Sequence, residues 1–480
     1  MRLTSAAMLV VILLLDATND SRAQETRITL DDVARAMGGA SLKSIEYTGA
    51  GASFAIGQST APGQPWPRFD VKSYVRSVNY ETASLREDAV RQRTDASPRG
   101  GGVPAMGEAR QIFAVSGEHT WNVAGETITP APVALAERQF QLWSTPHGVV
   151  KAAMAHGGSM QGRVIAYAIP GRALVKATVD AGNLVERVEA IIPNPVLGDI
   201  PVEVAYADYR DFGGVKFPMK IRQTAAGFPA LDLVVAEVRP NAPADIAVPQ
   251  AVRDSANPYA RVTSQKVADG VWYLAGGTHH SVVIEMSDHL IVAESPLNDD
   301  RALAVIAQAK QLVPGKPIRY VINSHHHFDH AGGLRAMAAA GATVITHEKN
   351  RAFFEQALAA PATLAPDQMA RAGRSAIVEG VRDRRALTDG TRTVEIAQIA
   401  GNLHADDLLM VYLPKEKLVI EADTYTPAAP NAPPASPVNP NSVNLADNIA
   451  KLGLTVDQIL PLHGRVVPLA DLMKAISRAP

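Results

Sequence analysis

One short stretch of the sequence decides how the rest is interpreted: Ser324-His325-His326-His327-Phe328-Asp329-His330. It holds five side chains that can bind a metal ion, since imidazole and carboxylate are ordinary ligands of zinc and related divalent cations. Residues 318–322 before it form an apolar β-type run, and an Ala-rich helical pattern starts at Leu334 after it. We therefore expect the stretch to lie on a loop between a strand and a helix, where α/β scaffolds usually carry their chemistry.

Three further candidate ligands support a metal site. In an extended segment, residues two apart point to the same side, so His325 and His327 can face one cation. Asp329 and His330 can turn toward a second. A His-rich surface tract is the alternative, but each later candidate stands at one end of an apolar strand-like run: His404, Asp423 and His463. All of them could converge on one edge of a sheet.

The order H-x-H-x-D-H, then His404, Asp423 and His463-Gly464, resembles the metallo-β-lactamase fold superfamily over roughly residues 262–480. The resemblance implies an αββα domain, in which two mixed sheets form a sandwich flanked by helices. It also implies a two-metal centre with Asp423 as the bridge. One metal would be bound by His325, His327 and His404, and the other by Asp329, His330 and His463.

The implied chemistry is hydrolysis. Two cations about 3.5–4 Å apart can share a water and lower its pKa toward about 7, so hydroxide can attack a carbonyl. We expect two zinc ions, with iron or manganese as alternatives. Asp329 could accept a hydrogen bond from the nucleophile or pass a proton to the leaving group. Tyr425 could assist the carbonyl oxygen, as a tyrosine does in lactone-hydrolysing relatives.

The expected function is an exported binuclear zinc hydrolase acting on an ester, lactone, thioester or amide carbonyl. The chain contains no cysteine, a ligand in one branch of the true β-lactamases, and the bridging aspartate resembles hydroxyacylglutathione hydrolases and lactonases. β-Lactamase activity remains one alternative. The others are a mononuclear iron dioxygenase of the same fold, and a periplasmic ligand-binding protein with a non-catalytic metal domain.

The remainder of the chain divides into three parts. Residues 1–23 predict a secretory signal peptide, because Arg2 precedes an apolar run over 6–15 and small residues follow. The protein would then be exported, and periplasmic if the source is a Gram-negative bacterium. Residues 24–241 predict a mainly antiparallel β domain of unknown role, with one strand region over 111–123. Residues 242–261, rich in proline and alanine, predict a linker to the catalytic domain, 262–480.

The composition and charge of the chain limit which classes of binding partner can be expected. The chain has 480 residues, 47% of them hydrophobic, and a formal net charge of −2. This near-neutral balance gives no reason to expect nucleic acid or an anionic membrane as partner. The apolar run near the N-terminus is about half the ~20 residues that a membrane-spanning helix needs. We therefore expect a small-molecule substrate and no membrane span, while the sequence leaves the oligomeric state open.

A few polar residues fall outside the ligand pattern. His279 and His280 lie in a glycine-rich connection and are candidates for substrate contact. Glu294 ends a strand and is a candidate for an outer contact to a metal ligand. His347 is expected to be structural. The first region has few side chains suited to chemistry, and its histidines are likewise expected to be structural: His119, His147 and His156.

Overall fold

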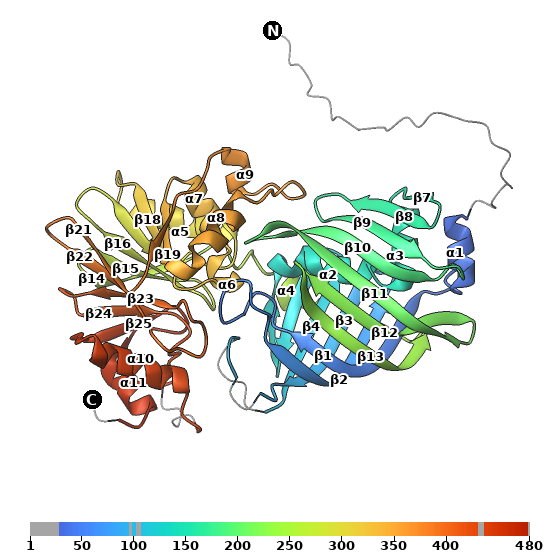
Figure 1. Cartoon of the computed structure of the whole chain (residues 1–480), viewed down its shortest axis with the longest axis horizontal. Coiled ribbons are helices and arrows are strands. Elements are labelled where there is room, and N and C mark those ends of the chain that lie inside the picture. The colour runs from blue at the N-terminus through green and yellow to red at the C-terminus, as the bar shows by residue number, and fades with distance from the viewer. Residues whose placement is uncertain (1–27, 96–97, 102–106, 431–435, 479–480) are drawn as a thin grey trace, which may run out of the picture.

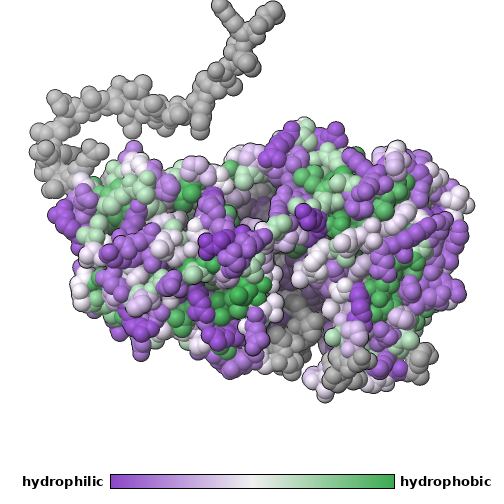
Figure 2. All heavy atoms as spheres, turned by 180° about the vertical axis from the view of Figure 1, so that it is seen from behind, coloured by the Kyte–Doolittle hydropathy of each residue, from purple (hydrophilic) through white to green (hydrophobic). Residues whose placement is uncertain are grey.

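The computed structural model describes residues 28–95, 98–101, 107–430 and 436–478. The expected signal peptide, residues 1–23, lies outside the described residues. None of the helices in the described part of the chain combines the length and apolar character that a membrane crossing requires. Two lobes make up the molecule (Figure 1), and the surface is hollowed between them on the face shown in Figure 2.

The first lobe is one antiparallel sheet of 13 strands, in the order β6-β5-β4-β3-β2-β1-β13-β12-β11-β10-β9-β8-β7. We call residues 30–240 the β domain. Its strands are β1 (Ser44–Phe54), β2 (Arg68–Asn79), β3 (Ser84–Gln92), β4 (Ala109–Ser116), β5 (His119–Ala124), β6 (Thr127–Pro130), β7 (Ser159–Gln161), β8 (Val164–Ile169), β9 (Ala173–Val179), β10 (Val185–Asn194), β11 (Gly198–Phe212), β12 (Val215–Ala225) and β13 (Phe228–Pro240). The expected mainly antiparallel β architecture is confirmed.

Helices fill the hollow of this sheet. The sheet curves around α2 (Leu135–Trp143) and α3 (Pro146–Ala155), with α1 (Leu30–Ala36) beside α3 (Figure 1). A short 3-10 turn, η1 (Pro132–Ala134), leads into α2. One apolar core joins the helices to the inner face, because alternate residues of each strand point inward. The expected single strand region over 111–123 is instead the β4–β5 hairpin, since Gly117 turns the chain with φ +56°.

The second lobe contains two sheets packed face to face. A seven-stranded mixed sheet holds β14 (Thr263–Ala268), β15 (Val271–Ala275), β16 (Ser281–Glu285), β17 (Leu290–Ala293), β18 (Ile318–Ile322), β19 (Thr343–His347) and β20 (Val378–Val381). A six-stranded mixed sheet holds β21 (Arg384–Thr388), β22 (Thr393–Gln398), β23 (Leu409–Leu413), β24 (Leu418–Glu421), β25 (Gln458–Pro461) and β26 (Val467–Pro468). Apolar side chains of both sheets form one cluster between them.

Helices cover the outer faces of both sheets. The seven-stranded sheet is covered by α5 (Asp299–Leu312), α7 (Leu334–Ala339), α8 (Arg351–Ala359) and α9 (Gln368–Ala372). The six-stranded sheet is covered by α10 (Pro440–Lys451) and α11 (Leu469–Ala475). Two short elements, α6 (Phe328–Ala331) and η2 (Glu348–Asn350), follow β18 and β19. The expected sandwich of two mixed sheets flanked by helices is therefore confirmed.

The connection between the lobes is partly ordered. Within the predicted linker, α4 (Gln250–Arg253) forms a helical turn. Ile246 and Val252 are buried against Ala114 and Trp121 of the β domain. The proline- and alanine-rich composition does not predict this packing, because only two apolar side chains anchor the segment.

Candidate metal centre

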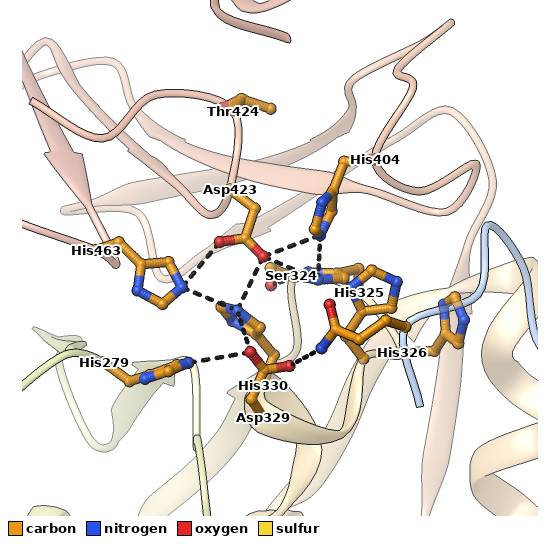
Figure 3. A network of polar contacts seen from close by, with 12 residues as sticks. His279, Ser324, His325, His326, Asp329, His330, His404, Asp423, Thr424 and His463 are labelled. Carbon is orange, nitrogen blue, oxygen red and sulfur yellow. Dashed lines mark hydrogen bonds and ion pairs between the residues drawn. The ribbon is translucent and has the colours of Figure 1, made fainter. Parts of the chain in front are cut away.

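Loops at the ends of several strands meet at one end of the sandwich. The heptapeptide leaves the end of β18 and enters α6. The other candidate ligands stand on the loop before β23 and on the loops that follow β24 and β25. Figure 3 shows side chains of these loops pointing toward one another: His325, His330, His404, Asp423 and His463. With His327, six of the seven residues expected as ligands come together.

These side chains form two sets, each with its ligand atoms within 4.8 Å of one another. The first histidine set comprises His325, His327, His404 and Asp423. The second histidine set comprises His279, His330 and His463. Imidazole and carboxylate groups at this spacing can hold a divalent cation.

The carboxylate of Asp423 touches both sets. Its Oδ2 lies 2.9 Å from Nε2 of His404 and 3.1 Å from Nε2 of His330. The same oxygen lies 3.4 Å from Nε2 of His325. Its Oδ1 lies 2.8 Å from Nε2 of His463. One carboxylate between two groups of imidazoles is the arrangement that a bridging ligand requires.

The second set differs from the one implied by the resemblance, because His279 stands where Asp329 was expected. Oδ2 of Asp329 lies 3.2 Å from Nε2 of His279 and 3.9 Å from Nε2 of His330. Asp329 therefore borders the second set, while His279, from the loop before β16, lies within it. His280 instead faces away, since its Nδ1 accepts from the Gly276 amide and its Nε2 lies 3.0 Å from the Gly464 carbonyl oxygen.

Burial and mutual contact set the charges of these groups. Burial lowers the pKa of His325 to about 3, and the nearby His330 acts in the same direction. Burial would raise the pKa of Asp423, but the surrounding histidines, His330 foremost, hold it well below its usual range. Burial would lower the pKa of His330, but the carboxylates of Asp423 and Asp329 raise it well above its usual range. A cation that replaces these mutual contacts would release protons, because metal-bound imidazole is neutral.

Ring nitrogens with a lone pair that no hydrogen bond uses indicate whether a metal ion fits the cluster. Nε2 of His327 lies 2.7 Å from the Ser59 carbonyl oxygen, which can only accept, so the ring proton is on Nε2. Nδ1 of His327 then carries a lone pair, and it is buried without a hydrogen-bond partner among the described residues. Nε2 of His325 lies 3.1 Å from Nε2 of His404, and both nitrogens lie within 3.4 Å of Oδ2 of Asp423. Imidazole nitrogens in this arrangement can donate their lone pairs to a divalent cation.

Comparison with known proteins identifies this lobe. Residues 274–433 match the family model described as the metallo-beta-lactamase superfamily. The C-terminal domain is a metallo-β-lactamase superfamily domain. This confirms the family expected from the ligand motif.

Solved structures similar to the chain cover the same share of it. The metallo-beta-lactamase from Pontibacter korlensis is 16% identical, with a TM-score of 0.35, over 45% of this chain and 98% of that chain. The metallo-beta-lactamase FIM-1 from Pseudomonas aeruginosa in the mono-zinc form is 17% identical, with a TM-score of 0.35, over 45% and 94%. Rubredoxin oxygen:oxidoreductase from Desulfovibrio gigas is 17% identical, with a TM-score of 0.36, over 45% and 61%.

Behind the ligands of the metallo-β-lactamase domain lies a buried carboxylate, Glu294. It is 1% exposed, and its Oε2 lies 3.3 Å from Nδ1 of His330. Ser324 Oγ donates to the same oxygen. These contacts orient the His330 ring so that Nε2 faces Asp423, which is the outer contact that metal-binding histidines usually have. His326, which belongs to neither histidine set, is held by Asp407, whose Oδ2 lies 2.9 Å from its Nδ1.

The β domain also reaches this site. Nε2 of Gln58 donates to Oδ1 of Asp329 at 2.7 Å, and Oγ of Ser59 lies 3.1 Å from Nε2 of His326. In Figure 3, a ribbon in the blue of the N-terminal strands passes beside His326. The sequence contains no signal for these contacts, because glutamine and serine are common and their partners lie more than 250 residues away. The first region, expected to hold few side chains suited to chemistry, thus places Gln58 and Ser59 against residues of the heptapeptide.

Tyr425, expected to act on the carbonyl oxygen, lies elsewhere. It is 5% exposed and packs in the apolar cluster under α10, with Met410 and Leu445. Among the described contacts, its backbone amide donates to Glu421 and none joins its side chain to the two histidine sets. Its catalytic role stays a prediction without structural support. His347 is structural, since its Nδ1 accepts from the Lys349 amide at the start of η2.

Proposed function

We propose that the protein is a binuclear zinc hydrolase that attacks an ester, lactone, thioester or amide carbonyl. The observation that supports this most strongly is the Asp423 carboxylate, which touches both histidine sets. The first set would hold one ion, and the second set with Asp329 would hold the other. Bound there, the ions would supply a hydroxide at neutral pH and polarise the carbonyl.

The chain's own groups would handle the proton. Burial would raise the pKa of Asp329, but the neighbouring His330 and His279 hold it well below its usual range, so the carboxylate is ionised at pH 7. It can accept a hydrogen bond from the attacking water and later give a proton to the leaving group. Gln58 donates to Oδ1 of Asp329 and so holds the carboxylate in place.

Export remains part of the proposal. A signal peptide over residues 1–23 would be removed, so the mature chain would start near Gln24. Mass analysis of protein from the exported fraction measures this directly. Exported protein that still begins at Met1 would overturn the prediction of a cleaved signal peptide.

Metal content and a substrate screen test the hydrolase. Protein purified without added metal is measured by mass spectrometry and then assayed against ester, lactone, thioester and β-lactam substrates. We expect about two zinc ions per chain and hydrolysis that a chelator abolishes. The variants His327→Ala and Asp329→Ala should lose turnover, while His156→Ala, on the exposed end of α3, should keep it.

The outcomes separate the alternatives. Hydrolysis of β-lactams alone would make the protein a β-lactamase. One iron per chain without hydrolysis would favour oxygen chemistry. No metal, with no activity after zinc is added, would overturn the hydrolase and leave ligand binding by the β domain as the function.

A further inference from the structure

The inner face of the curved sheet changes character along β3. Alternate residues of this strand point inward: Leu85 is fully buried and Ala89 is 8% exposed, but Glu87 and Arg91 are charged. Beyond the charged end of the strand, Arg99 pairs with Asp406 of the metallo-β-lactamase domain. The polar part of the inner face therefore lies toward the metal centre.

A cavity of about 380 Å³ lies between this polar face and α2. We call it the arginine cavity. Its charged and amide lining includes Arg76, Glu87, Arg91, Gln111, Glu137 and Arg138. The volume falls in the range of about 300–1,000 Å³ that is usual for small-molecule sites. Charged groups are costly to bury inside a sheet, so such a lining indicates a ligand rather than a core.

Two of the three arginines have free capacity to donate. Arg76 is 6% exposed and pairs with Glu87, but its Nε has no hydrogen-bond partner among the described residues. Arg91 lies 4.4 Å from the ring centroid of Phe69 and, in the described part of the chain, donates to no carboxylate. Arg138 is occupied, because its Nη1 donates to the carbonyl oxygens of Ala114 and Trp121.

The balance of charge in the cavity is positive. Three arginines face two glutamates, Glu87 and Glu137. Burial raises the pKa of Glu137 and lowers the pKa of Arg91, so desolvation disfavours the charged form of both groups. An anion between Arg76 and Arg91 would compensate the desolvation of both guanidinium groups.

We propose that the arginine cavity binds an organic carboxylate, held by Arg91 and beside Arg76, both of which line the cavity. Aromatic and aliphatic residues of the lining, such as Phe54, Ile56 and Phe113, would contact the rest of the molecule. Gln58 lines the cavity and also donates to Asp329, so the site lies beside the metal centre. The carboxylate belongs either to the hydrolysed substrate or to a separate effector, and its binding does not depend on hydrolysis.

Calorimetry with a matched pair of probes tests the proposal on the full-length, metal-loaded protein. The probes are 4-phenylbutyrate and its neutral analogue 4-phenylbutyramide. We expect saturable binding of the carboxylate and at least tenfold weaker binding of the amide, because charge-assisted hydrogen bonds are the stronger ones. Equal binding of the two probes, or no binding of 4-phenylbutyrate at millimolar concentration, would overturn the site.

Variants distinguish the cavity from the metals, which also bind carboxylates. Arg91→Gln should weaken 4-phenylbutyrate binding at least tenfold, and Arg91→Lys should restore most of it. Arg86→Gln is the matched control, because Arg86 lies on the same strand, points outward and pairs with Asp88. An unchanged Kd in a folded Arg91→Gln protein would place the anion elsewhere.

Kinetics then identify the source of the carboxylate. If the cavity holds part of the substrate, 4-phenylbutyrate should inhibit hydrolysis competitively, and Arg91→Gln should raise KM for carboxylate-bearing esters but not for neutral ones. If the carboxylate is a separate effector, 4-phenylbutyrate should change kcat without competing. Either result supports the site. A protein that hydrolyses nothing would contradict the proposed hydrolase, while the calorimetry would still decide the cavity.

Discussion

The backbone carbonyl oxygen of Ser59 lies 2.7 Å from Nε2 of His327, although 268 positions separate the two residues in the sequence. The contact leaves Nδ1 of His327 as the only ring nitrogen free to bind a cation. The tautomer of a candidate metal ligand is thus fixed by the β domain and not by the domain that carries the motif.

Gly57 brings the Ser59 carbonyl into place, and Gly57→Ala tests that contact. Gly57 adopts φ +72°, and a Cβ there would collide with the ring of Phe328. The loop would have to move, so we expect zinc affinity and kcat to fall about tenfold or more. Gly63→Ala is the control, since Gly63 has φ +77° with nothing within 4 Å of the added Cβ. Equal effects of the two substitutions would show that backbone strain alone matters.

Gln58→Ala removes the amide that donates to Oδ1 of Asp329. Loss of an outer contact to a metal-site carboxylate typically costs about 10–100-fold in metal affinity or activity. We expect a fall of that size in kcat, measured on the best substrate of the screen at saturating zinc. Gln64→Ala, on the exposed part of the same loop, should change neither metal affinity nor kcat. Full activity in Gln58→Ala would mean that the Gln58–Asp329 hydrogen bond does not contribute to catalysis.

Asp423→Ala removes the carboxylate that joins the two histidine sets. The imidazoles would then face one another without a negative charge between them, so we expect fewer than two zinc ions per chain and no measurable turnover. Metal analysis after dialysis is the measurement. Asp457→Ala provides a surface control, because that side chain is 63% exposed. Retention of both ions would rule out a bridging role.

Glu294→Gln keeps the shape of a buried side chain but removes its charge. Glu294 accepts from Ser324 and lies 3.3 Å from Nδ1 of His330. The neutral amide would hold that ring less firmly, so zinc affinity should fall about tenfold, within the range for such contacts. Competition with a fluorescent chelator measures the change. The exposed Glu355→Gln on α8 should be indistinguishable from the unaltered protein.

His147 gives the β domain a pH-dependent stability. It is 2% exposed, its Nε2 lies 3.1 Å from the Met37 carbonyl oxygen, and burial lowers its pKa to about 4 from 6.5. Because the unfolded ring binds protons more readily, this contribution is complete above about pH 6.5 and is lost as the pH falls toward 4. From pH 7 to pH 5, the free energy of unfolding should fall by about 2 kcal/mol more than in His147→Gln.

Urea unfolding followed by tryptophan fluorescence measures this difference. Three of the four tryptophans lie in the β domain: Trp66, Trp121 and Trp143. Other titrating groups affect both proteins equally. The difference between the two proteins in how the free energy of unfolding changes with pH is therefore the His147 contribution. Parallel pH profiles for the two proteins would mean that the ring is not neutral in the folded state.

The sequence by itself determined the αββα lobe and the residues that meet at its edge. Apolar periodicity is a local property, and ligand-type side chains at strand ends such as Asp423 and His463 must follow their strands to the same edge of a sheet. The family motif is equally local, so the superfamily could be named from it. That these residues bind zinc remains a prediction.

Only the tertiary structure decided which groups surround that edge. It placed His279 in the second set with Asp329 beside it, and it buried Tyr425 under α10. It also set Gln58 against Asp329, and it enclosed Arg91 in a cavity of the curved sheet. These contacts join segments far apart in the chain, and they depend on how sheets and lobes pack. No local pattern of residue types encodes that packing.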